Sequence, residues 1–300
     1  MNRDIVQSEV NTARGLLSAN IAVLLFGLAG VLGKLSMLPA PLIVLGRVVF
    51  AGGALVIVVL ARRVDLRPRR RRDLALLIGQ GALLAVHWTA FFASISVSNV
   101  AIGLLSFSSF PLFTAFLEPL LLRQRANRFQ IAAAFVILFG IYLLVPSFSL
   151  TNAATLGVML GLLAGATFAL LSVINRWLGK SYASLAISLY QDGCAAIVLL
   201  PTLFLLPTTT LFTPRELGIL LLLGVGCTAI AHTLFIAGMR DITAQLASLF
   251  GSLEPVWGIL FALLLLDEVP RLRTLIGGAI ILLATLAPVL APIIIPKRCI

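Results

Sequence analysis

Charged residues are scarce in this 300-residue chain: they make up 11% of it, whereas 60% of its residues are hydrophobic. The mean hydropathy is +1.12. So apolar a composition excludes a soluble globular domain. The three cysteines, Cys194, Cys227 and Cys299, are too few and too scattered to form a disulfide framework.

The chain also lacks the residue patterns on which most catalysis depends. It has two histidines and eleven acidic residues. These form no zinc-binding helix motif, and no cysteine pair or serine nucleophile elbow is present. A membrane-embedded enzyme acting on lipids would need clustered carboxylates or a nucleophile near one leaflet, whereas these acids are dispersed. The sequence therefore predicts a protein that is not an enzyme and has no metal and no cofactor.

Long apolar segments are what the sequence has in abundance. A helix needs about 20 apolar residues to cross the hydrocarbon core of a bilayer. Charged, proline-rich or asparagine-rich breaks separate ten such segments, so we expect an all-α polytopic membrane protein with ten transmembrane helices. The predicted spans are 15–36, 40–61, 73–95, 99–122, 128–146, 154–175, 182–206, 215–239, 242–266 and 271–296. In the sixth span, the spacing of Gly157, Gly161 and Gly165 predicts close helix packing.

The positive charges predict how the chain is oriented. With a cytoplasmic N-terminus, seventeen Lys and Arg residues fall at the cytoplasmic edge of the membrane and four at the outer edge, as the positive-inside rule requires. Seven of the seventeen are arginines within 62–72. Because this cluster lies directly between two apolar segments, we assign it to topology and not to nucleic-acid binding. The first fourteen residues are polar and lack a signal-peptide cleavage site, which predicts a retained first span and two cytoplasmic termini.

Five spans in each half would place the second half upside down relative to the first. Three residue pairs recur at nearly constant spacing in matching spans of the two halves: His87 and His232 at 145 residues, Pro111 and Pro255 at 144, and Phe26 and Phe168 at 142. We therefore predict two inverted five-helix repeats. The chain divides into a cytoplasmic N-terminal segment 1–14, a first repeat 15–147, a second repeat 148–296 and a cytoplasmic tail 297–300.

Pro111 and Pro255 each fall about midway along a predicted span, where a proline frees a helix carbonyl that another group must bond. They could be tolerated kinks. Paired kinks at repeat-related positions are, however, typical of transporters, in which kinked helices line the cavity and bend as each face opens. Ser108, beside the first proline, could point at a solute or bond back to its own helix. We favour the transport interpretation.

Ionisable side chains are rare inside the predicted spans, where each central charge costs about 2.5–3.5 kcal/mol on insertion scales. Arg47, Asp192 and Glu254 lie within spans and are candidates for coupling or gating. Arg47 could neutralise Asp192 or bind a substrate carboxylate. Glu254 lies near the predicted midplane and has Phe110 as its repeat partner. It could couple transport to protons or bond the backbone freed by the helix break.

Histidine and aromatic residues complete the candidate site. His87 and His232 are predicted at related depths, as solute ligands or as a symmetric structural pair. Trp88 and Phe91 follow His87 at helical spacing and could form an aromatic wall. The predicted substrate-binding residues are His87, Trp88, Phe91, Ser108, Pro111, Tyr190, His232 and Trp257, and the coupling or gating candidates are Arg47, Asp192, Glu254 and Pro255.

The end of the fourth helix in each half resembles a known family. Ser252-Leu253-Glu254-Pro255-Val256, continuing through a leucine-rich helix to Asp267-Glu268, is similar to the helix-nine pattern of the drug/metabolite transporter superfamily, specifically its EamA-type members. In the first half the pattern is weaker, because Gln124 stands where that family often has Glu. The resemblance covers nearly the whole chain. It implies a central cavity lined by helices one to four and six to nine.

Within that superfamily, His87-Trp88 and the surrounding aromatic residues look most like the YddG-type aromatic amino-acid exporters. This resemblance implies a secondary transporter that exports aromatic and other neutral amino acids across the bacterial inner membrane by alternating access. Export of another small solute, such as a drug or a nucleobase, is the nearest alternative. The expected partners are an amino-acid substrate, membrane lipid and, if transport is coupled, protons. A monomer would suffice, and nucleic acid is not expected.

Overall fold

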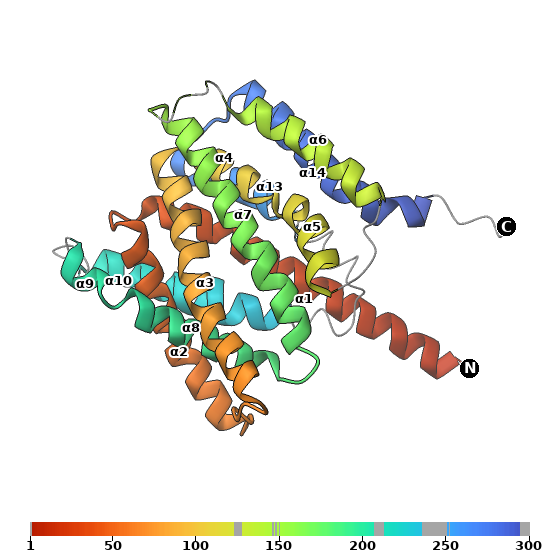
Figure 1. Cartoon of the computed structure of the whole chain (residues 1–300), viewed down its shortest axis with the longest axis vertical. Coiled ribbons are helices and arrows are strands. Elements are labelled where there is room, and N and C mark those ends of the chain that lie inside the picture. The colour runs from red at the N-terminus through yellow and green to blue at the C-terminus, as the bar shows by residue number, and fades with distance from the viewer. Residues whose placement is uncertain are drawn as a thin grey trace.

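A computed structural model describes residues 2–122, 128–145, 147, 149, 151–206, 213–235, 251 and 253–294 (Figure 1). Across these residues the structure is helical and has no strand, so the all-α prediction is confirmed for this part of the chain. The helices are α1 (Asn2–Leu35), α2 (Ala40–Ala61), α3 (Arg71–Val97), α4 (Val100–Phe107), α5 (Phe110–Leu122), α6 (Arg128–Leu144), α7 (Ala153–Leu178), α8 (Ser184–Leu199), α9 (Thr202–Leu205), α10 (Pro214–Leu221), the π-helix η1 (Leu222–Ile230), α13 (Glu254–Leu266) and α14 (Leu272–Ile294).

Among the described residues, seven helical segments are long and apolar enough to cross a membrane, and three shorter apolar helices accompany them. The seven are Ala13–Leu35, Ala40–Ala61, Arg71–Val97, Val100–Leu121, Ala153–Asn175, Ser184–Leu205 and Pro214–Phe235, and the shorter three are Ile131–Leu144, Glu254–Leu266 and Leu272–Ala287. Their order agrees with the predicted spans. In the predicted ninth span, 242–250 lies outside the described residues, and α13 begins only at Glu254.

The two prolines predicted as mid-helix kinks lie in the first turns of helices. The predicted fourth span is divided into α4 and α5 by a break at Ser108 and Ser109, and Pro111 is the second residue of α5. Pro255 is likewise the second residue of α13. A first-turn proline removes no bond of the helix ladder, because the N–H it lacks would have no partner within the helix. The kinks predicted at these prolines therefore take the form of breaks in the helix, and each proline lies in the first turn of the helix that follows its break.

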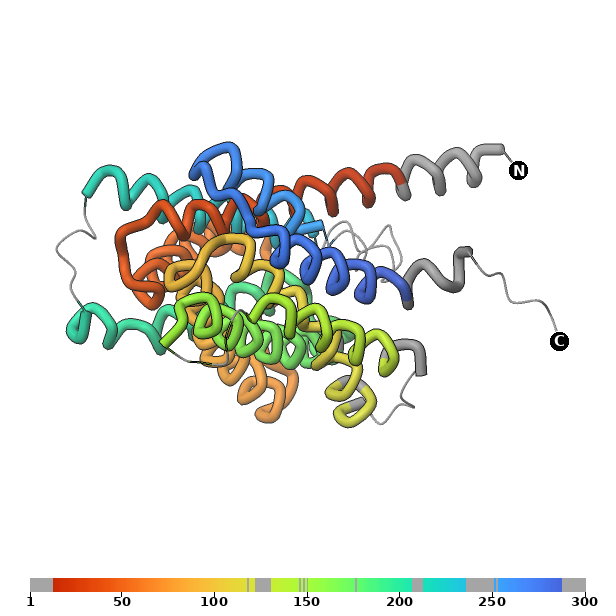
Figure 2. Tube along the Cα trace, turned by 90° about the horizontal axis from the view of Figure 1, so that it is seen from above, coloured from red at the N-terminus to blue at the C-terminus, as the bar shows by residue number. Residues whose placement is uncertain are grey.

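The helices pack in a crossed pattern between the two halves of the chain. In the first half, α3 packs against α7 and α8; in the second half, η1 packs against α1 and α2. Similarly, α4 and α5 pack against α7, whereas α13 packs against α1. The α6 and α14 helices pack against each other at one side of the bundle (Figure 1). Figure 2 shows α1 and α14 extending toward the same end of the molecule.

Close packing of α7 follows from its glycines, as predicted. A Cβ atom added at Gly161 would lie 2.4 Å from the Cβ of Ser106 on α4, and one at Gly157 would lie 2.4 Å from the Ser98 hydroxyl at the end of α3. Side chains at these positions would push the helices apart. The glycine stripe therefore brings α7 against the helices that carry the candidate site.

Replacing Gly161 with alanine is expected to destabilise the protein by about 1–3 kcal/mol, as overpacking does in well-packed interiors. Gly53→Ala on α2 is the matched control, because a Cβ there meets no atom within 4 Å. Thermal unfolding of both variants in the same detergent measures the difference. Equal melting temperatures for the two variants would contradict the close contact of α7 with α4.

Candidate functional site

Arg47 of α2 lies at the centre of the candidate site. Its side chain is 3% exposed. The guanidinium stacks on Trp88 of α3, with its central carbon 3.9 Å from the ring centroid. Its Nε donates to Thr228 Oγ1 at 2.5 Å, and Nη2 lies 3.4 Å from the carbonyl oxygen of Cys227. One buried cation thus joins α2, α3 and η1.

The π-helical segment η1 brings Thr228 to Arg47. Its wider turn lets the Thr228 hydroxyl donate to the carbonyl of Leu223, five residues earlier, at 2.7 Å while accepting from Arg47. Gly224 allows η1 to approach α2, since a Cβ there would lie 2.6 Å from the carbonyl oxygen of Arg47. Single π-helical turns often occur at functional sites, and the sequence gives no signal for this one.

His87 of α3 is buried among aromatic rings and bound to α7. Its Nδ1 lies 2.9 Å from the carbonyl oxygen of Ala164. Because a carbonyl only accepts hydrogen bonds, Nδ1 carries the proton and donates it. The His87 ring lies 5.6 Å from that of Phe107 and 5.4 Å from that of Phe168, centroid to centroid. Phe91 completes this group, 6.5 Å from His87.

His232 continues the same row of rings from the other half of the chain. It lies 5.9 Å from Trp88 and meets Phe26 of α1 edge-on at 5.3 Å. An unbroken row therefore runs from Phe168 through His87, Trp88 and His232 to Phe26. Neighbouring rings in this row lie 5.3–6.4 Å apart, centroid to centroid, within the range of favourable aromatic pairs. We call these five residues the aromatic row.

Asp192 of α8 and Glu254 of α13 face the same cation. Both interact electrostatically with Arg47. Asp192 is 3% exposed. Among the described residues, neither acid has a hydrogen-bond or ion-pair partner. Three of the four predicted coupling or gating residues thus interact electrostatically, but within the described ranges Arg47 and Asp192 form no direct ion pair.

Two other predicted site residues have partners in their own helical segment. The Ser108 hydroxyl donates to the carbonyl of Leu104 at 2.9 Å, which is the back-bonding alternative. Trp257 stacks on Phe261, 6.5 Å away and one turn along α13. Pro111 and Pro255 each lie in the first turn of a helix.

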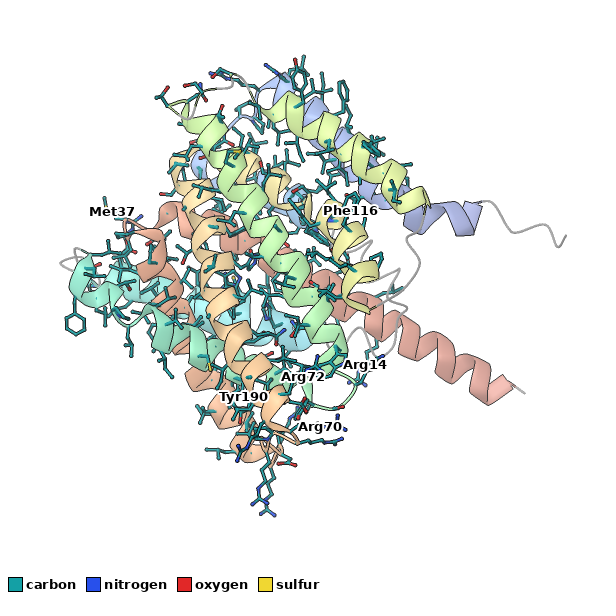
Figure 3. All side chains as sticks on the ribbon, in the orientation of Figure 1. Arg14, Met37, Arg70, Arg72, Phe116 and Tyr190 are labelled. Atoms are coloured by element: carbon teal, nitrogen blue, oxygen red, sulfur yellow. The ribbon has the colours of Figure 1, made fainter. Side chains whose placement is uncertain are left out.

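Tyr190 lies away from Arg47, at the end of the molecule that carries the arginines of 62–72. Its hydroxyl donates to the carbonyl of Leu66 at 3.0 Å. In Figure 3, Tyr190, Arg70 and Arg72 are labelled in the lower part of the molecule, whereas Met37 lies at a different edge. The structure therefore does not bring Tyr190 to the site predicted for it.

A buried carboxylate ties the chain at this same end. The Tyr182 hydroxyl donates to Asp73 Oδ2 at 2.6 Å and accepts from the backbone N–H of Arg69 at 2.8 Å. Desolvation and the hydrogen bond to Asp73 raise the pKa of the Tyr182 hydroxyl, so it stays a donor at neutral pH. We call Asp73 and Tyr182 the basic-end clasp, because they join α3 to the segment between α7 and α8.

A second buried carboxylate ties the chain at the opposite end of α2. Glu216 of α10 is 2% exposed. It accepts hydrogen bonds from the Ser36 hydroxyl at 2.6 Å and from the backbone N–H of Met37 at 3.1 Å. We call Glu216 with Ser36 and Met37 the far-end clasp. It joins α10 to the segment between α1 and α2.

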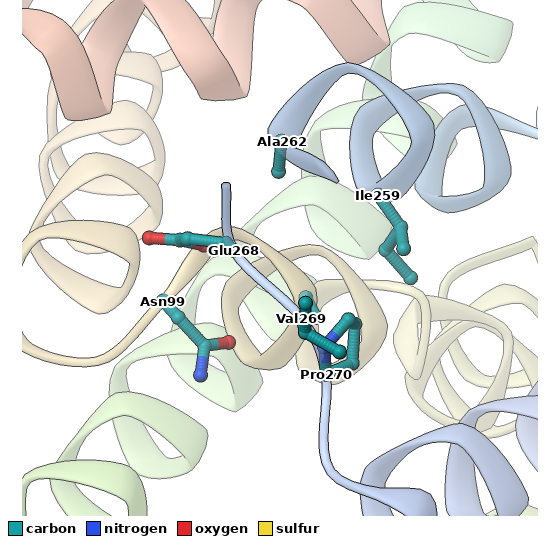
Figure 4. A pocket seen from close by; sticks show the side chains of 7 residues that line it. Asn99, Ile259, Ala262, Glu268, Val269 and Pro270 are labelled. Atoms are coloured by element: carbon teal, nitrogen blue, oxygen red, sulfur yellow. The ribbon is translucent and has the colours of Figure 1, made fainter. Parts of the chain in front are cut away.

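A small pocket lies between the ends of α3 and α13 (Figure 4). Its volume is about 120 Å³, and its lining includes Asn99, Glu268 and Pro270. Glu268 accepts from the backbone N–H of Val100 at 2.9 Å. A space of this size holds a few water molecules.

Sequence reasoning missed Thr228, Phe107 and Glu216 as members of these arrangements. Phe26 and Phe168 were noted only as a repeat-related pair, although each contacts one of the two histidines. That spacing was a signal that could have placed them in the site. No local pattern marked Thr228, because its role depends on the π-helical register.

Comparison with known families decides what kind of protein carries this site. The model of the EamA-like transporter family matches residues 13–145 and again residues 155–289. Together these two ranges cover well over half of the chain. This chain belongs to the EamA-like transporter family.

Similar proteins are also named as transporters. The uncharacterized transporter YwfM of Bacillus subtilis (strain 168) is 28% identical over 210 residues, which are 70% of this chain and 71% of that protein. An uncharacterized transporter of Archaeoglobus fulgidus is 26% identical over 210 residues, 70% of this chain and 74% of that protein. One crystal structure of a protein matches with a TM-score of 0.66 and 20% identity, covering 94% of this chain and 99% of that one. At this identity the match shows a shared fold alone.

Membership of the EamA-like family makes this a multi-pass membrane transporter and implies a small-molecule substrate and a lipid environment. The superfamily-level resemblance noted in the sequence is thereby confirmed. Membership is also consistent with the prediction that the chain is not an enzyme.

Proposed function

We propose that this EamA-like protein is a secondary transporter that exports aromatic and other neutral amino acids from the bacterial cytoplasm across the inner membrane. The observation that carries the proposal is the aromatic row beside Arg47, Asp192 and Glu254. Rings offer a surface to an apolar side chain. The cation and the two acids offer opposite charges to a zwitterion.

Alternating access about a pseudo-twofold axis fits the contacts between the halves. The first helix of one half would meet the third helix of the other half in the same way on both sides of such an axis. Phe26 against His232 and Phe168 against His87 are two such contacts, and their members are related by the repeat spacing. The double match to one family model also favours two inverted five-helix repeats in a ten-span protein.

The two clasps are suited to act as gates at opposite faces. Asp73 and Glu216 are 143 residues apart, close to the spacing of the repeat. Each lies in the first turn of its helix and accepts hydrogen bonds from the segment that joins the first and second helices of the other half. In alternating access, opening one face requires breaking its clasp while the other stays closed.

Both termini and the arginine-rich segment 62–72 are proposed to be cytoplasmic, because most membrane-edge cations then lie on that side. In a variant without native cysteines, Arg69→Cys is expected to react with a membrane-impermeant thiol reagent only after the cell is opened. Met37→Cys, on the exposed segment before α2, should react in intact spheroplasts. Labelling of Arg69→Cys from outside would contradict the proposed topology and with it the inverted repeat.

The aromatic preference is tested by Trp88→Ala, in which the ring between Arg47 and His232 is removed. In proteoliposomes supplied with a panel of labelled amino acids, flux of phenylalanine and tryptophan is expected to fall about tenfold or more relative to alanine. This corresponds to the 1–3 kcal/mol that a stacking contact contributes. Trp177→Ala is the matched control, because Trp177 is 37% exposed and lies near Arg72.

A planar solute without amino-acid groups, such as a nucleobase, is the second candidate, since the aromatic row would stack on it equally well. The same panel decides between the two. Flux of labelled nucleobases without flux of any amino acid would replace the amino-acid proposal. If the Trp88→Ala variant transports each amino acid at the wild-type rate, the aromatic row is not part of the substrate site.

A further inference from the structure

We propose that Arg47 and Thr228 form the subsite for the carboxylate of the substrate, while Asp192 faces its ammonium group. This inference rests on the proposed function. It assigns the substrate class as free zwitterionic α-amino acids and assigns roles to Arg47, Thr228 and Asp192 beside the aromatic row. Peptides blocked at either end, amines and simple carboxylic acids are then poor substrates.

Arg47 is a buried cation that no carboxylate binds within the described part of the chain. Its side chain is 3% exposed, and no carboxylate within the described ranges lies within ion-pair distance of it. Burying an unpaired charge is costly unless an opposite charge and hydrogen bonds satisfy it. An anionic group on the substrate would supply the missing partner during transport.

The guanidinium of Arg47 is fixed in position and still has N–H donors that no acceptor among the described residues uses. Trp88 stacks on its face and Thr228 accepts from Nε, so both the plane and its rotation are fixed. Nη2 makes one long contact, and Nη1 has no acceptor among the described residues. Guanidinium groups bind carboxylates through two parallel N–H donors. The free edge formed by Nη1 and Nη2 is therefore suited to a carboxylate.

A buried acid lies on the helix that packs against the helix of Arg47. Asp192 is 3% exposed on α8, and α8 packs against α2. Among the described residues, Asp192 and Arg47 form no ion pair. A free amino acid offers a carboxylate and an ammonium group on the same carbon atom, so it can satisfy the cation and this acid together. An amine without a carboxylate would leave Arg47 unpaired, and an acid without an amine would be repelled by Asp192.

The aromatic row adjoins the carboxylate subsite, which limits the size of the substrate. Trp88 belongs to the row and also to the Arg47 subsite, so a side chain that lies along the row is directly joined to the bound carboxylate. Longer molecules, in which carboxylate and ring are far apart, could not occupy both positions. The inferred pose therefore places the α-carbon between Arg47 and Asp192, with the side chain toward His87 or His232.

The test compares wild type with Arg47→Gln, Arg47→Lys and Thr228→Val in proteoliposomes. Uptake of labelled L-phenylalanine is measured against three unlabelled competitors: L-phenylalanine, 3-phenylpropionate, which lacks the amine, and phenethylamine, which lacks the carboxylate. In wild type only L-phenylalanine should compete well. Arg47→Gln is expected to raise the half-saturation concentration for L-phenylalanine about tenfold or more, which is the loss expected for one charge-assisted hydrogen bond. Arg47→Lys keeps the positive charge and should raise this concentration less.

Thr228→Val keeps the cation and the side-chain shape but removes the acceptor that orients Nε. It is expected to raise the half-saturation concentration for L-phenylalanine less than Arg47→Gln does. It serves as the readout if Arg47→Gln does not yield folded protein. Cys194→Ala, a half-buried residue on α8, is the matched control and should retain the wild-type half-saturation concentration. Gel filtration of each purified variant checks folding.

The outcomes separate this inference from the proposed function. If wild type transports amino acids, but neither Arg47→Gln nor Thr228→Val changes the half-saturation concentration, the carboxylate subsite is wrong and the proposed function stands. If wild type transports 3-phenylpropionate instead, with the same dependence on Arg47, the amino-acid proposal falls and the carboxylate subsite stands. If phenethylamine competes as well as L-phenylalanine in wild type, the zwitterion assignment is overturned.

Discussion

Glu254→Gln is expected to abolish the response of net solute flux to an imposed pH gradient, while solute exchange at equal concentrations on both sides continues. Ionisable side chains in a membrane are costly and often mark proton pathways. Glu254 begins α13 directly after a helix break and interacts electrostatically with Arg47. Gln preserves the shape and an acceptor oxygen but cannot take up or release a proton near neutral pH. The measurement is labelled flux in proteoliposomes with and without the gradient.

Two matched variants make this experiment decisive. Asp192→Asn changes the other acid that faces Arg47, so a coupling role confined to Glu254 predicts that Asp192→Asn keeps the gradient response. Glu268→Gln changes an acid at the end of α13 that bonds the backbone N–H of Val100, and it should also keep the response. If gradient-driven flux persists in Glu254→Gln, this residue does not couple protons, and facilitated diffusion or coupling at Asp192 becomes the better account.

Locking either clasp is expected to stop transport completely, because alternating access requires each face to open in turn. In a chain without native cysteines, Ser36→Cys with Glu216→Cys replaces the far-end clasp, and Asp73→Cys with Tyr182→Cys replaces the basic-end clasp. The native contacts are 2.6 Å long in both cases, so a short, cleavable bifunctional thiol reagent can bridge each pair. Flux should disappear on bridging and return when the reagent is cleaved.

The control for this prediction is a bridge that cannot restrain the two halves relative to each other. Ser149 and Thr151 contact each other at 2.7 Å within one exposed connection, so bridging Ser149→Cys with Thr151→Cys should leave flux unchanged. In protein bridged at one clasp, the solute should reach its site only from the opposite side of the membrane. The accessible side should therefore differ between the two bridged proteins. Full flux through a protein bridged at either clasp would show that the clasp is not a gate.

Much of the architecture could be predicted because composition and periodicity depend on local sequence alone. Sixty per cent hydrophobic residues and runs of about 20 apolar residues require helices in lipid, where every backbone group must bond within its own segment. The order of the segments and the close packing of α7 at Gly161 followed from the same local signals. The family resemblance rested on residues around Glu254, and the family match agrees with it.

The helix breaks could not be located from proline alone. Pro111 predicted a kink inside one helix, but the chain breaks before it at Ser108 and Ser109, and the proline begins the next helix. A proline is compatible with a kink or with a helix start. The choice depends on the local backbone bonding, and here the N–H and the hydroxyl of Ser109 both donate to the carbonyl of Ser106, at 3.2 and 2.6 Å, which closes a turn before the proline.

The sequence by itself determined which residues are scarce enough in a membrane to matter: Arg47, the two histidines, Asp192 and Glu254. Only the tertiary structure decided that Arg47 stacks on Trp88 and bonds Thr228 rather than pairing with Asp192. It also placed Tyr190 with the arginine-rich end of the chain instead of with the site. The physical reason is that a side chain's cost in lipid depends on its own chemistry, whereas its partner depends on the register in which distant helices cross.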